Sequence, residues 1–394
     1  MAVGDPNLFF SRDTRVFLGQ GTNLWEIPVL NGYSFTQTTN SSTITVAEMS
    51  NCAGGGTSRR GQRVFNDSLS PAEWSFDVYL RPTLSSGTMV AVEEALWANM
   101  AAANAYTSEW GAGVTRTAAA GGNPATLDFD FADSNTTLLG TFDLYFVLGG
   151  AKVSSLNYTA SEQTTIYKVT DCVVNEATIN FEIDGIAMVS WSGLGKQIVE
   201  LATFNAAPST VEVPNAAFPA GAIRAGIDSN SNMIRNRLTC LDLTTAGTGG
   251  FSANYDLTLT GGSITISNNI TFVTPETIGI VNVPLGHITG TRSVSGNFTC
   301  YLDEKTNSSI DLMEDLLLAT NVVTNSFGAK FYLGGKAATN YPTGPGVLFD
   351  MPNCHLEIPS INADDIIAVE VNFTALPTTI GDADEIARIR YVGV

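Results

Sequence analysis

The sequence is poor in the residue types from which most catalytic and metal sites are built. Its 394 residues include only two histidines, His287 and His355, and neither has a second ligand at a metal-binding spacing. The five cysteines are odd in number, widely spaced and without a CxxC pair, which argues against a disulfide framework and a zinc site. No GxSxG motif or cysteine signature supplies a nucleophile. We therefore predict a protein without metal, cofactor or enzyme activity.

Charge and long apolar runs are also scarce. Only 14% of the residues are charged and 44% are apolar, a balance that suits a chain whose surface is covered by copies of itself. The 38 acidic and 19 basic residues give a net charge of -19, so we expect the chain to repel nucleic acid phosphates. No run approaches the roughly 18 apolar residues of a membrane span, and the amino terminus lacks a signal-peptide pattern. We expect no membrane contact and a chain that stays in the cytoplasm where it is made.

Two halves of the sequence repeat the same features in the same order, which indicates a duplicated unit. A short helical stretch, at residues 90–100 and again at 310–320, is one of five such matches. The other matches are residues 32–40 with 261–269, 76–80 with 298–302, 142–150 with 329–335, and 187–193 with 369–375. We predict a first domain at residues 1–195, a linker at 196–234 and a second domain at 235–394.

Each half carries the alternation of a β-strand. Apolar and polar residues alternate at residues 74–81 and 367–375, and residues 178–184 carry a polar face behind Ile179, Phe181 and Ile183. A period of two places one set of side chains on a packed face and the other set toward solvent or a neighbour. The predicted fold class is mainly β, with one amphipathic helix packed on a sheet in each half.

The second helix has a start signal. Ser308 can cap the free amides, and Asp311 lies favourably in the first turn. Ile310, Met313 and Leu317 share one side of the helix, which we expect to pack against the sheet.

One cluster is basic, the sequence CAGGGTSRRGQR at residues 52–63. It lacks the preceding strand, the following helix start and the Lys-Ser/Thr pair of a phosphate-binding loop. It is either a flexible loop or an arm whose Arg59, Arg60 and Arg63 pair with acidic groups of another subunit. The net charge of -19 favours the arm.

Three segments resemble the tail tube proteins of long-tailed siphophages whose subunit carries two fused tube domains. They are residues 60–82, residues 189–201 and, most closely, residues 261–317, and the similarity extends over nearly the whole chain. The resemblance implies that each half is a β-sandwich or half-barrel with a flanking helix. It also implies a structural subunit whose trimers form pseudo-sixfold rings, and these rings stack into a hollow, negatively lined conduit for genome delivery.

The resemblance further implies the partners. They are other copies of the chain and the tail initiator, terminator and tape-measure proteins, while DNA passes through the lumen without specific binding. The location is the virion tail, assembled in the cytoplasm of the bacterial host. Loops at residues 50–71 and 268–292 are expected to contact the next ring or subunit. The predicted interface residues are Arg59, Arg60, Arg63, Asn268, Asn269, His287 and Arg292.

Two other classes of protein stay open. A virion or cell-surface β-sandwich that binds carbohydrate needs an exposed aromatic platform, for which Trp97, Tyr106 and Trp110 are candidates. A hydrolase needs two carboxylates at a set separation across a cleft. The carboxylate pairs at residues 93–94, 364–365 and 382–385 are candidates, although their settings suit solvated charge better.

Overall fold

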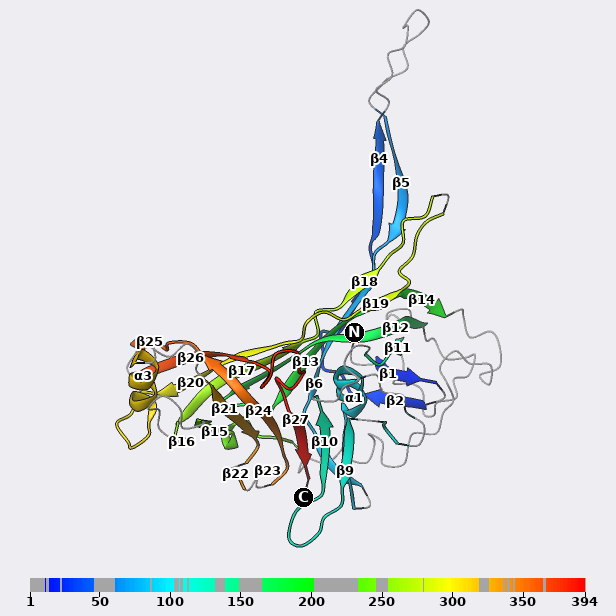
Figure 1. Ribbon diagram of the computed structural model, residues 1–394. Helices are drawn as coiled ribbons and strands as arrows, with labels where there is room; N and C mark the ends of the chain where they lie inside the picture. The colour runs from blue at the N-terminus through cyan, green and yellow to red at the C-terminus, as the bar shows by residue number, and fades with distance from the viewer. Residues whose placement is uncertain are drawn as a thin grey trace, which may run out of the picture.

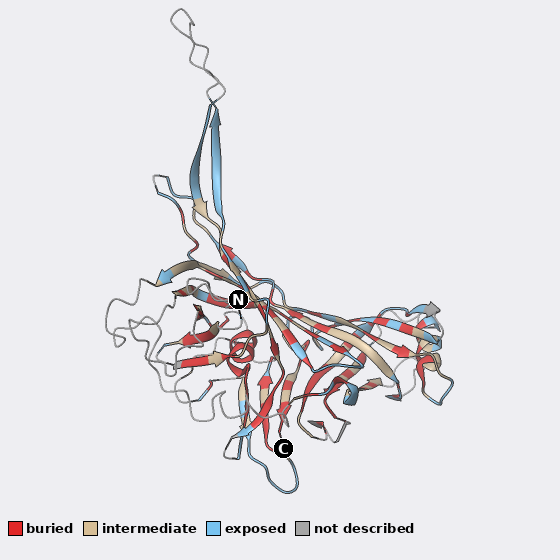
Figure 2. Cartoon of the chain, turned by 180° about the vertical axis from the view of Figure 1, so that it is seen from behind, coloured by how far each residue is buried: buried red, intermediate tan, exposed pale blue. Residues whose placement is uncertain are grey.

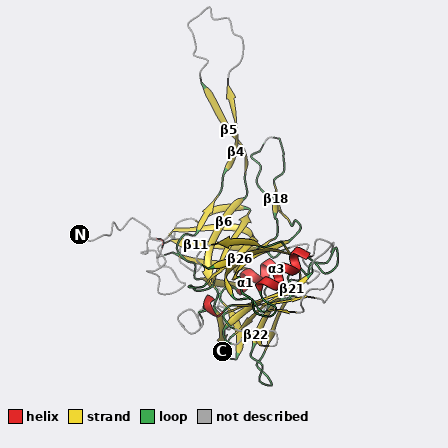
Figure 3. Ribbon diagram, turned by 90° about the vertical axis from the view of Figure 1, so that its left-hand side faces the viewer, coloured by secondary structure: helices red, strands yellow, loops and turns green. Residues whose placement is uncertain are grey.

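The computed structural model describes the chain with several interruptions. It covers residues 11, 14–21, 23–45, 61–85, 87–102, 106, 109–111, 113–131, 139–148, 165–201, 233–245, 254–278, 280–318, 326–335, 337–338, 341–342, 344–363 and 366–393. The described residues form mainly β-strands, as the sequence predicts, with two α-helices that pack beside the sheets (Figures 1 and 3).

The elements fall into two halves. The first half contains β1 (Arg15–Gln20), β2 (Asn23–Ile27), β3 (Ser34–Thr36), β4 (Thr39–Thr45), β5 (Gln62–Leu69), β6 (Ala72–Tyr79), β7 (Pro82–Ser85), β8 (Thr88–Ala91), α1 (Glu94–Ala101), β9 (Val114–Thr117), β10 (Thr126–Asp130), β11 (Phe142–Leu148), β12 (Thr165–Glu182), β13 (Met188–Gly195) and β14 (Gln197–Leu201). The second half contains a 3-10 turn (Asn236–Leu238), β15 (Cys240–Thr245), β16 (Asn254–Tyr255), β17 (Leu259–Ser267), β18 (Thr271–Val273), β19 (Gly286–Ile288), β20 (Ser293–Tyr301), α3 (Ser309–Leu318), β21 (Phe327–Leu333), β22 (Ala337–Ala338), β23 (Tyr341–Pro342), β24 (Gly346–Leu356), β25 (Ser360–Ala363), β26 (Ile367–Ala375) and β27 (Arg388–Val392).

The halves share one strand order, which supports the duplication inferred from the sequence. In the first half the neighbours run β1, β11, β12, β13, β6, β3, and in the second half they run β15, β21, β24, β26, β20, β17. A hairpin separates β3 from β6 and another separates β17 from β20, and a helix follows β6 and β20 in turn.

Two bulges mark the same place in each half. Phe142 lies opposite Cys172, and Phe327 lies opposite Cys354; the register shifts directly after each pair. Both thiols are fully buried, so each cysteine acts as a small apolar residue at the bend of a long strand.

The strand register corrects the last of the sequence matches. Phe76 lies opposite Trp191, and its counterpart Phe298 lies opposite Val371. Trp191 therefore corresponds to Val371, whereas the sequence match of residues 187–193 with 369–375 sets it level with Phe373. The error is two residues, which leaves every side chain on the correct face because the side-chain period of a strand is two.

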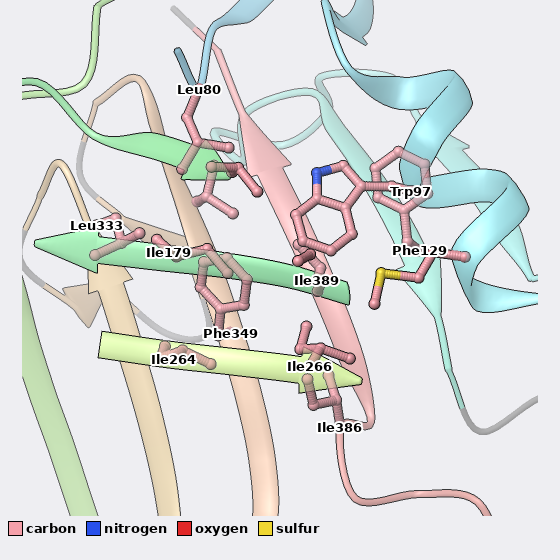
Figure 4. Close-up of a cluster of buried hydrophobic side chains, with 14 of the residues drawn as sticks. Leu80, Trp97, Phe129, Ile179, Ile264, Ile266, Leu333, Phe349, Ile386 and Ile389 are labelled. Atoms are coloured by element: carbon pink, nitrogen blue, oxygen red, sulfur yellow. The ribbon is translucent and has the colours of Figure 1, made fainter. Parts of the chain in front are cut away.

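One antiparallel sheet runs through both halves, and we call it the central sheet. Its strands in order are β3, β6, β13, the second part of β12, β17, β20, β26 and β25. The halves meet where residues 176–182 of β12 pair with residues 261–267 of β17. Behind this junction, Ile179 and Ile264 pack with Trp97 of α1 and Phe349 of β24 in one buried cluster (Figure 4).

The last strand joins the halves a second time. β27 pairs on one edge with β24 of its own half and on the other edge with β10 of the first half. The ion pair of Arg390 with Asp128 crosses this contact at 2.6 Å. The two halves are thus one packed body with a shared core.

Two hairpins leave the body on the same side, and we call them the long arm (β4–β5) and the short arm (β18–β19). The strands of the long arm are exposed over most of their length (Figure 2). The short arm lies beside its base, where Leu69 donates its backbone N–H to the carbonyl oxygen of Asn282 at 2.8 Å. Neither helix in the described ranges has the length and hydrophobicity needed to cross a bilayer.

The helices differ in detail from the prediction. α1 begins at Glu94, four residues after the predicted start, and all eight of its residues are buried. In α3 the buried residues are Ser309, Leu312 and Leu316, while Leu317 is exposed, so the predicted packed side of Ile310, Met313 and Leu317 is wrong by about one position. Asp311 accepts the backbone N–H of Ser308, and the Ser308 hydroxyl donates to the carbonyl oxygen of Asp303.

Candidate functional site

The central sheet has one packed face and one polar face. Burial alternates along β6, β13 and β26, with apolar side chains on the core side and mostly polar side chains on the other, where Met188 and Leu194 of β13 are exceptions. The strands of this sheet contain no lysine or arginine, and their only acidic residues lie on the polar face. Those acidic residues are Glu73, Asp77, Glu176, Glu182 and Glu370.

Cross-strand register lines up the polar face in rows. One row crosses six strands, and each of its residues carries a hydroxyl or a carboxylate. In order across the sheet the row is Asp77, Ser190, Thr178, Thr265, Ser295 and Thr374.

Side-chain hydrogen bonds connect neighbouring strands along the polar face. The hydroxyls of Thr178 and Thr265 lie 3.1 Å apart across the junction of the two halves. Further along the same face, Ser263 donates to Asn297 at 2.8 Å, and Asn297 donates to Glu370 at 2.6 Å. Short side chains that bond to one another stay close to the sheet, so this part of the face is hydrophilic and negative.

This arrangement is a polar surface of short side chains. Among the residues that the structure describes, no three His, Cys, Asp or Glu side chains form a group that could hold a metal ion. The face carries carboxylates and no lysine or arginine. It therefore repels a polyanion, because phosphates bind through lysine and arginine.

The aromatic residues considered for carbohydrate binding lie elsewhere. Trp97 is fully buried and Trp110 is 6% exposed, and Trp110 stacks on Trp25 with ring centroids 5.1 Å apart. Tyr106 packs edge-on against both Trp25 and Trp110. These three side chains belong to the core of the first half and do not form an exposed platform.

Arg292 lies at the base of the short arm, where it is buried among distant segments of its own chain. Its guanidinium donates to the carbonyl oxygens of Phe131 at 3.0 Å and Ala383 at 3.2 Å, and to the side chain of Asn268 at 3.3 Å. Glu385 is the nearest carboxylate, at 3.9 Å. Burial lowers the pKa of Arg292, and the charge of Glu385 opposes that shift. Arg292 thus ties the first half to the carboxyl-terminal segment, and its predicted role between subunits stays a prediction.

Asn268 and Asn269 shape the start of the short arm. Asn268 is 3% exposed and donates to the carbonyl oxygens of Met100 and Val174, both at 3.3 Å. Asn269 has a φ of 48°, a left-handed conformation that asparagine tolerates, and it donates to the carbonyl oxygen of Thr291 at 2.7 Å.

The remaining predicted interface residues belong to the arms. His287 is half-buried beside Phe272 in the short arm, where burial lowers the pKa of its imidazole. Arg63 is exposed on the long arm, opposite Ile44. Arg59 and Arg60 lie outside the described residues. For all of these residues, contact with another subunit stays a prediction.

The residues of the polar face were not assigned from the sequence. The alternation of residues 178–184 gave a polar face for one strand, but the other strands of that face could be found only from their pairing. A usable signal was present, because residues 72–79, 178–182 and 367–375 alternate with a period of two and contain no lysine or arginine.

Comparison with known proteins gives two matches. A family model described as phage tail tube protein matches residues 86–375. The tail tube protein pb6 of Escherichia phage T5 is 30% identical over 382 residues, which cover 95% of this chain and 74% of that protein.

Proposed function

The chain belongs to the phage tail tube protein family and is a structural subunit of a bacteriophage tail tube. From this premise we propose that three copies close into a ring whose central sheets form a continuous wall around the genome. Eight strands from each of three chains would give a barrel of 3 × 8 = 24 strands. The units that repeat around the ring would be the predicted domains at residues 1–195 and 235–394. β14, which pairs with β12, extends the first unit into the predicted linker at residues 196–234.

The observation that carries this proposal is the junction of β12 with β17 inside one chain. Each partner in that junction has a counterpart in the other half: β25 occupies the place of the second part of β12, and β3 occupies the place of β17. In the described residues, β25 pairs only with β26 and β3 pairs only with β6, so each has an outer edge without a strand. An open edge can take a strand from another copy.

If β25 of one copy pairs with β3 of the next in the register that β12 has with β17, the two open edges are complementary. Thr178 lies opposite Thr265 in the chain, and the same register sets Ser360 opposite Thr36 of the next copy. Phe181 lies opposite Gly262, where an added Cβ would approach the phenyl ring to 2.7 Å. The corresponding pair is Ala363 and Tyr33, again one small residue against one ring, with the roles exchanged.

Exposure at the open edge supports the same contact. Ile179 is fully buried at the internal junction, whereas its counterpart Ile361 is 53% exposed in the single chain. Pro359 has no N–H to donate, so we expect the ladder between chains to centre on residues 360–363 and 33–36.

The polar face of the central sheet would line the bore. Its five carboxylates and the lack of lysine and arginine keep the wall negative, so the DNA finds no cation to hold its phosphates. The arms, which leave the body on one side, would contact the next ring. Arg59, Arg60 and Arg63 would pair there with acidic groups.

The rings at the two ends of the tube would contact the tail initiator and terminator proteins, and the lumen would hold the tape-measure protein. Assembly would take place in the cytoplasm of the bacterial host.

The test is a pair of cysteines at the proposed contact, Thr36→Cys with Ser360→Cys, in a chain that also carries Cys52→Ser. Directly opposite residues have Cβ atoms about 4.5–5.5 Å apart, within reach of a disulfide after a small adjustment. Oxidation of the assembled protein should give covalent chains of two and three copies and none longer. The control is Ser34→Cys with Ser360→Cys, which is displaced by two residues and should cross-link poorly. Products longer than three copies, or equal cross-linking of both pairs, would contradict the ring.

A further inference from the structure

The short arm packs over the first half of the chain as it leaves the sheet. Ile270 and Phe272 of this arm form a small buried cluster with Val173 of β12, and Leu194 of β13 packs against the cluster. The arm therefore does not stand free at its base. It is seated on the half that precedes it in the central sheet.

Asn282 fastens the short arm to the base of the long arm (Figure 1). The backbone N–H of Leu69 donates to the carbonyl oxygen of Asn282 at 2.8 Å, and the N–H of Asn282 donates to the carbonyl oxygen of Asp67 at 3.2 Å. The Asn282 side chain closes its own loop, because it exchanges two hydrogen bonds of 3.1 Å with the backbone of Thr277. The contact between the arms is thus built from ordered backbone.

The second half has a hollow at the place where the first half receives the short arm. The strand register sets Thr374 level with Leu194, and residues 289–291 level with residues 67–69. Thr374 and residues 289–291 line one hollow of about 730 Å³ at the base of the short arm. The same position of the repeat is therefore filled in the first half and open in the second.

The rim of this hollow is apolar, and it is specific to the second half. Lys196 alone separates β13 from β14, whereas residues 376–387 separate β26 from β27. The longer connection supplies Leu376 and Pro377 to the lining of the hollow, and it carries Ile380, whose side chain is fully exposed. Burial of such aliphatic side chains against a second surface is favourable.

The long arm carries apolar side chains that match this rim. Val64 and Phe65 lie a few residues from its base, as Ile270 and Phe272 do in the short arm, and they are 58% and 47% exposed. Successive side chains of a strand point to opposite faces. One of the two therefore faces a neighbouring surface whichever face of the arm lies toward it.

The proposed ring brings the long arm and the hollow together. β3 of the next copy would lie beside β25, as β17 lies beside β12 within the chain. The long arm connects β3 with β6, as the short arm connects β17 with β20. The long arm of the next copy would thus stand beside the second half in the way that the short arm stands beside the first.

We infer that the base of the long arm, at Val64 and Phe65, docks in the hollow of the neighbouring copy in the same ring, against Leu376 and Ile380. The inference rests on the proposed ring and adds a contact between chains besides the β25–β3 ladder. The 3 × 2 = 6 arms of a ring would then form a closed belt in which each arm is seated on the half before it. The tips of the long arms stay available for the next ring.

The first experiment compares Val64→Thr with Phe65→Thr in one chain against Leu84→Thr with Leu238→Thr as the matched control. The control side chains are also exposed, and neither lines the hollow. Thermal unfolding of the dilute chain should be unchanged in both variants, because the replaced side chains lie on the surface. In sedimentation velocity, the arm variant should need at least about tenfold more protein to form closed oligomers, since burial of one such side chain contributes about a factor of ten or more. The control should assemble as the unaltered chain does.

The second experiment joins the two surfaces with a short bifunctional maleimide on the Cys52→Ser background. Val64→Cys with Ile380→Cys and Phe65→Cys with Ile380→Cys place one thiol on each face of the arm in turn and the other on the rim. At least one of these pairs should join different chains of the assembled protein. Leu84→Cys with Ile380→Cys is the control and should not.

The outcomes separate the docking from the ring. If the arm variant assembles normally and the arm pairs cross-link no better than the control, while Thr36→Cys with Ser360→Cys cross-links, the docking is overturned and the ring stands. If Thr36→Cys with Ser360→Cys gives no product and the unaltered chain forms no closed oligomer, the ring fails and the docking fails with it.

Discussion

Trp74 lies directly opposite Gly193 on the neighbouring strand, and its indole ring occupies the space that a side chain at position 193 would need. An added Cβ would stand 2.3 Å from the ring and 2.2 Å from the carbonyl oxygen of Val173. The second half repeats this pair with the roles exchanged, because Gly296 lies opposite Phe373. Each half thus keeps one ring and one glycine at the same position of the sheet, and only the strand that supplies the ring differs.

Adding a methyl group at either glycine should therefore destabilise the chain. We expect Gly193→Ala and Gly296→Ala each to cost about 3 kcal/mol or more in free energy of unfolding, because backbone atoms close the space and cannot move aside. Urea unfolding followed by tryptophan fluorescence measures the cost. Gly286→Ala is the control, since nothing lies within 4 Å of an added Cβ there. A cost below about 0.5 kcal/mol at positions 193 and 296 would contradict the close approach.

Glu93 should make the stability fall as the pH rises. Burial raises the pKa of Glu93 to about 7, although the hydrogen bond from Tyr391 acts in the opposite direction. A folded-state pKa above the unfolded value means that the folded chain binds the proton more tightly, so stability is lost between about pH 4.5 and pH 7 and stays reduced above this window. We expect Glu93→Gln to unfold like the unaltered chain near pH 4 and to be more stable at pH 8, by on the order of 3 kcal/mol.

The neighbouring residue provides the control for that experiment. Glu94 is ion-paired with Arg116 at 2.9 Å, so Glu94→Gln should lower the stability at pH 8. Chemical unfolding at several pH values separates the two outcomes. A difference between Glu93→Gln and the unaltered chain that does not change with pH would show that Glu93 does not titrate in this range.

Arg292 should stabilise the folded single chain, whether or not it also takes part in contacts between subunits. Arg292→Ala removes hydrogen bonds to four separate segments and leaves Glu385 buried without its cation. We expect a loss of about 3–5 kcal/mol in the free energy of unfolding, measured at concentrations too low for assembly. Arg63→Ala, on the exposed long arm, should change this value by less than about 0.5 kcal/mol. Equal and small effects of both replacements would refute the assigned role of Arg292.

The arginines of the basic cluster should affect the stacking of rings into a tube and not the stability of the single chain. Replacing Arg59, Arg60 and Arg63 together with alanine should leave the unfolding free energy unchanged and reduce the length of the tubes seen by electron microscopy. The reason is the loss of cations that meet acidic groups of the next ring in a chain with a net charge of -19. Tubes of normal length from the triple variant would rule out the arm as an electrostatic contact.

Reversing charge on the polar face should make the wall hold DNA. Glu182→Lys with Glu370→Lys adds 2 × 2 = 4 charges per chain, and these positive charges can displace the counterions of the phosphates. Assembled tubes of this variant should retain DNA at low salt and release it as the salt rises. Asp256→Lys with Glu304→Lys, at two exposed sites outside the central sheet, is the charge-matched control. Equal retention by both variants would show that the polar face does not line the bore.

The sequence predicted the strands whose alternation is local. Residues 72–79 and 367–375 alternate because each strand has one packed face, and that pattern needs no knowledge of its neighbours. The order of the repeat was also visible, because each matched segment falls on an equivalent strand or helix. The two-residue error at Trp191 arose because the match compared residue types, while the register depends on the partner strand.

Contacts between residues far apart in the chain could not be predicted from the sequence. Arg292 stands between Thr291 and Ser293 after a glycine, which reads as an exposed loop, and it is buried only because residues 131 and 383 meet there. The packed side of α3 could not be assigned either. Several of its faces are apolar, and the sheet takes the one with Leu312 and Leu316.

The row of the polar face from Asp77 to Thr374 has a consequence for the motion of a molecule that passes along the face. A rod that turns or slides along this row meets nearly the same small oxygen-bearing groups at every strand, so no angle around the axis is much better than the next. The energy profile for rotation and translation would then be shallow. A long helical cargo could follow its own pitch past such a wall with little friction and without a preferred place to stop.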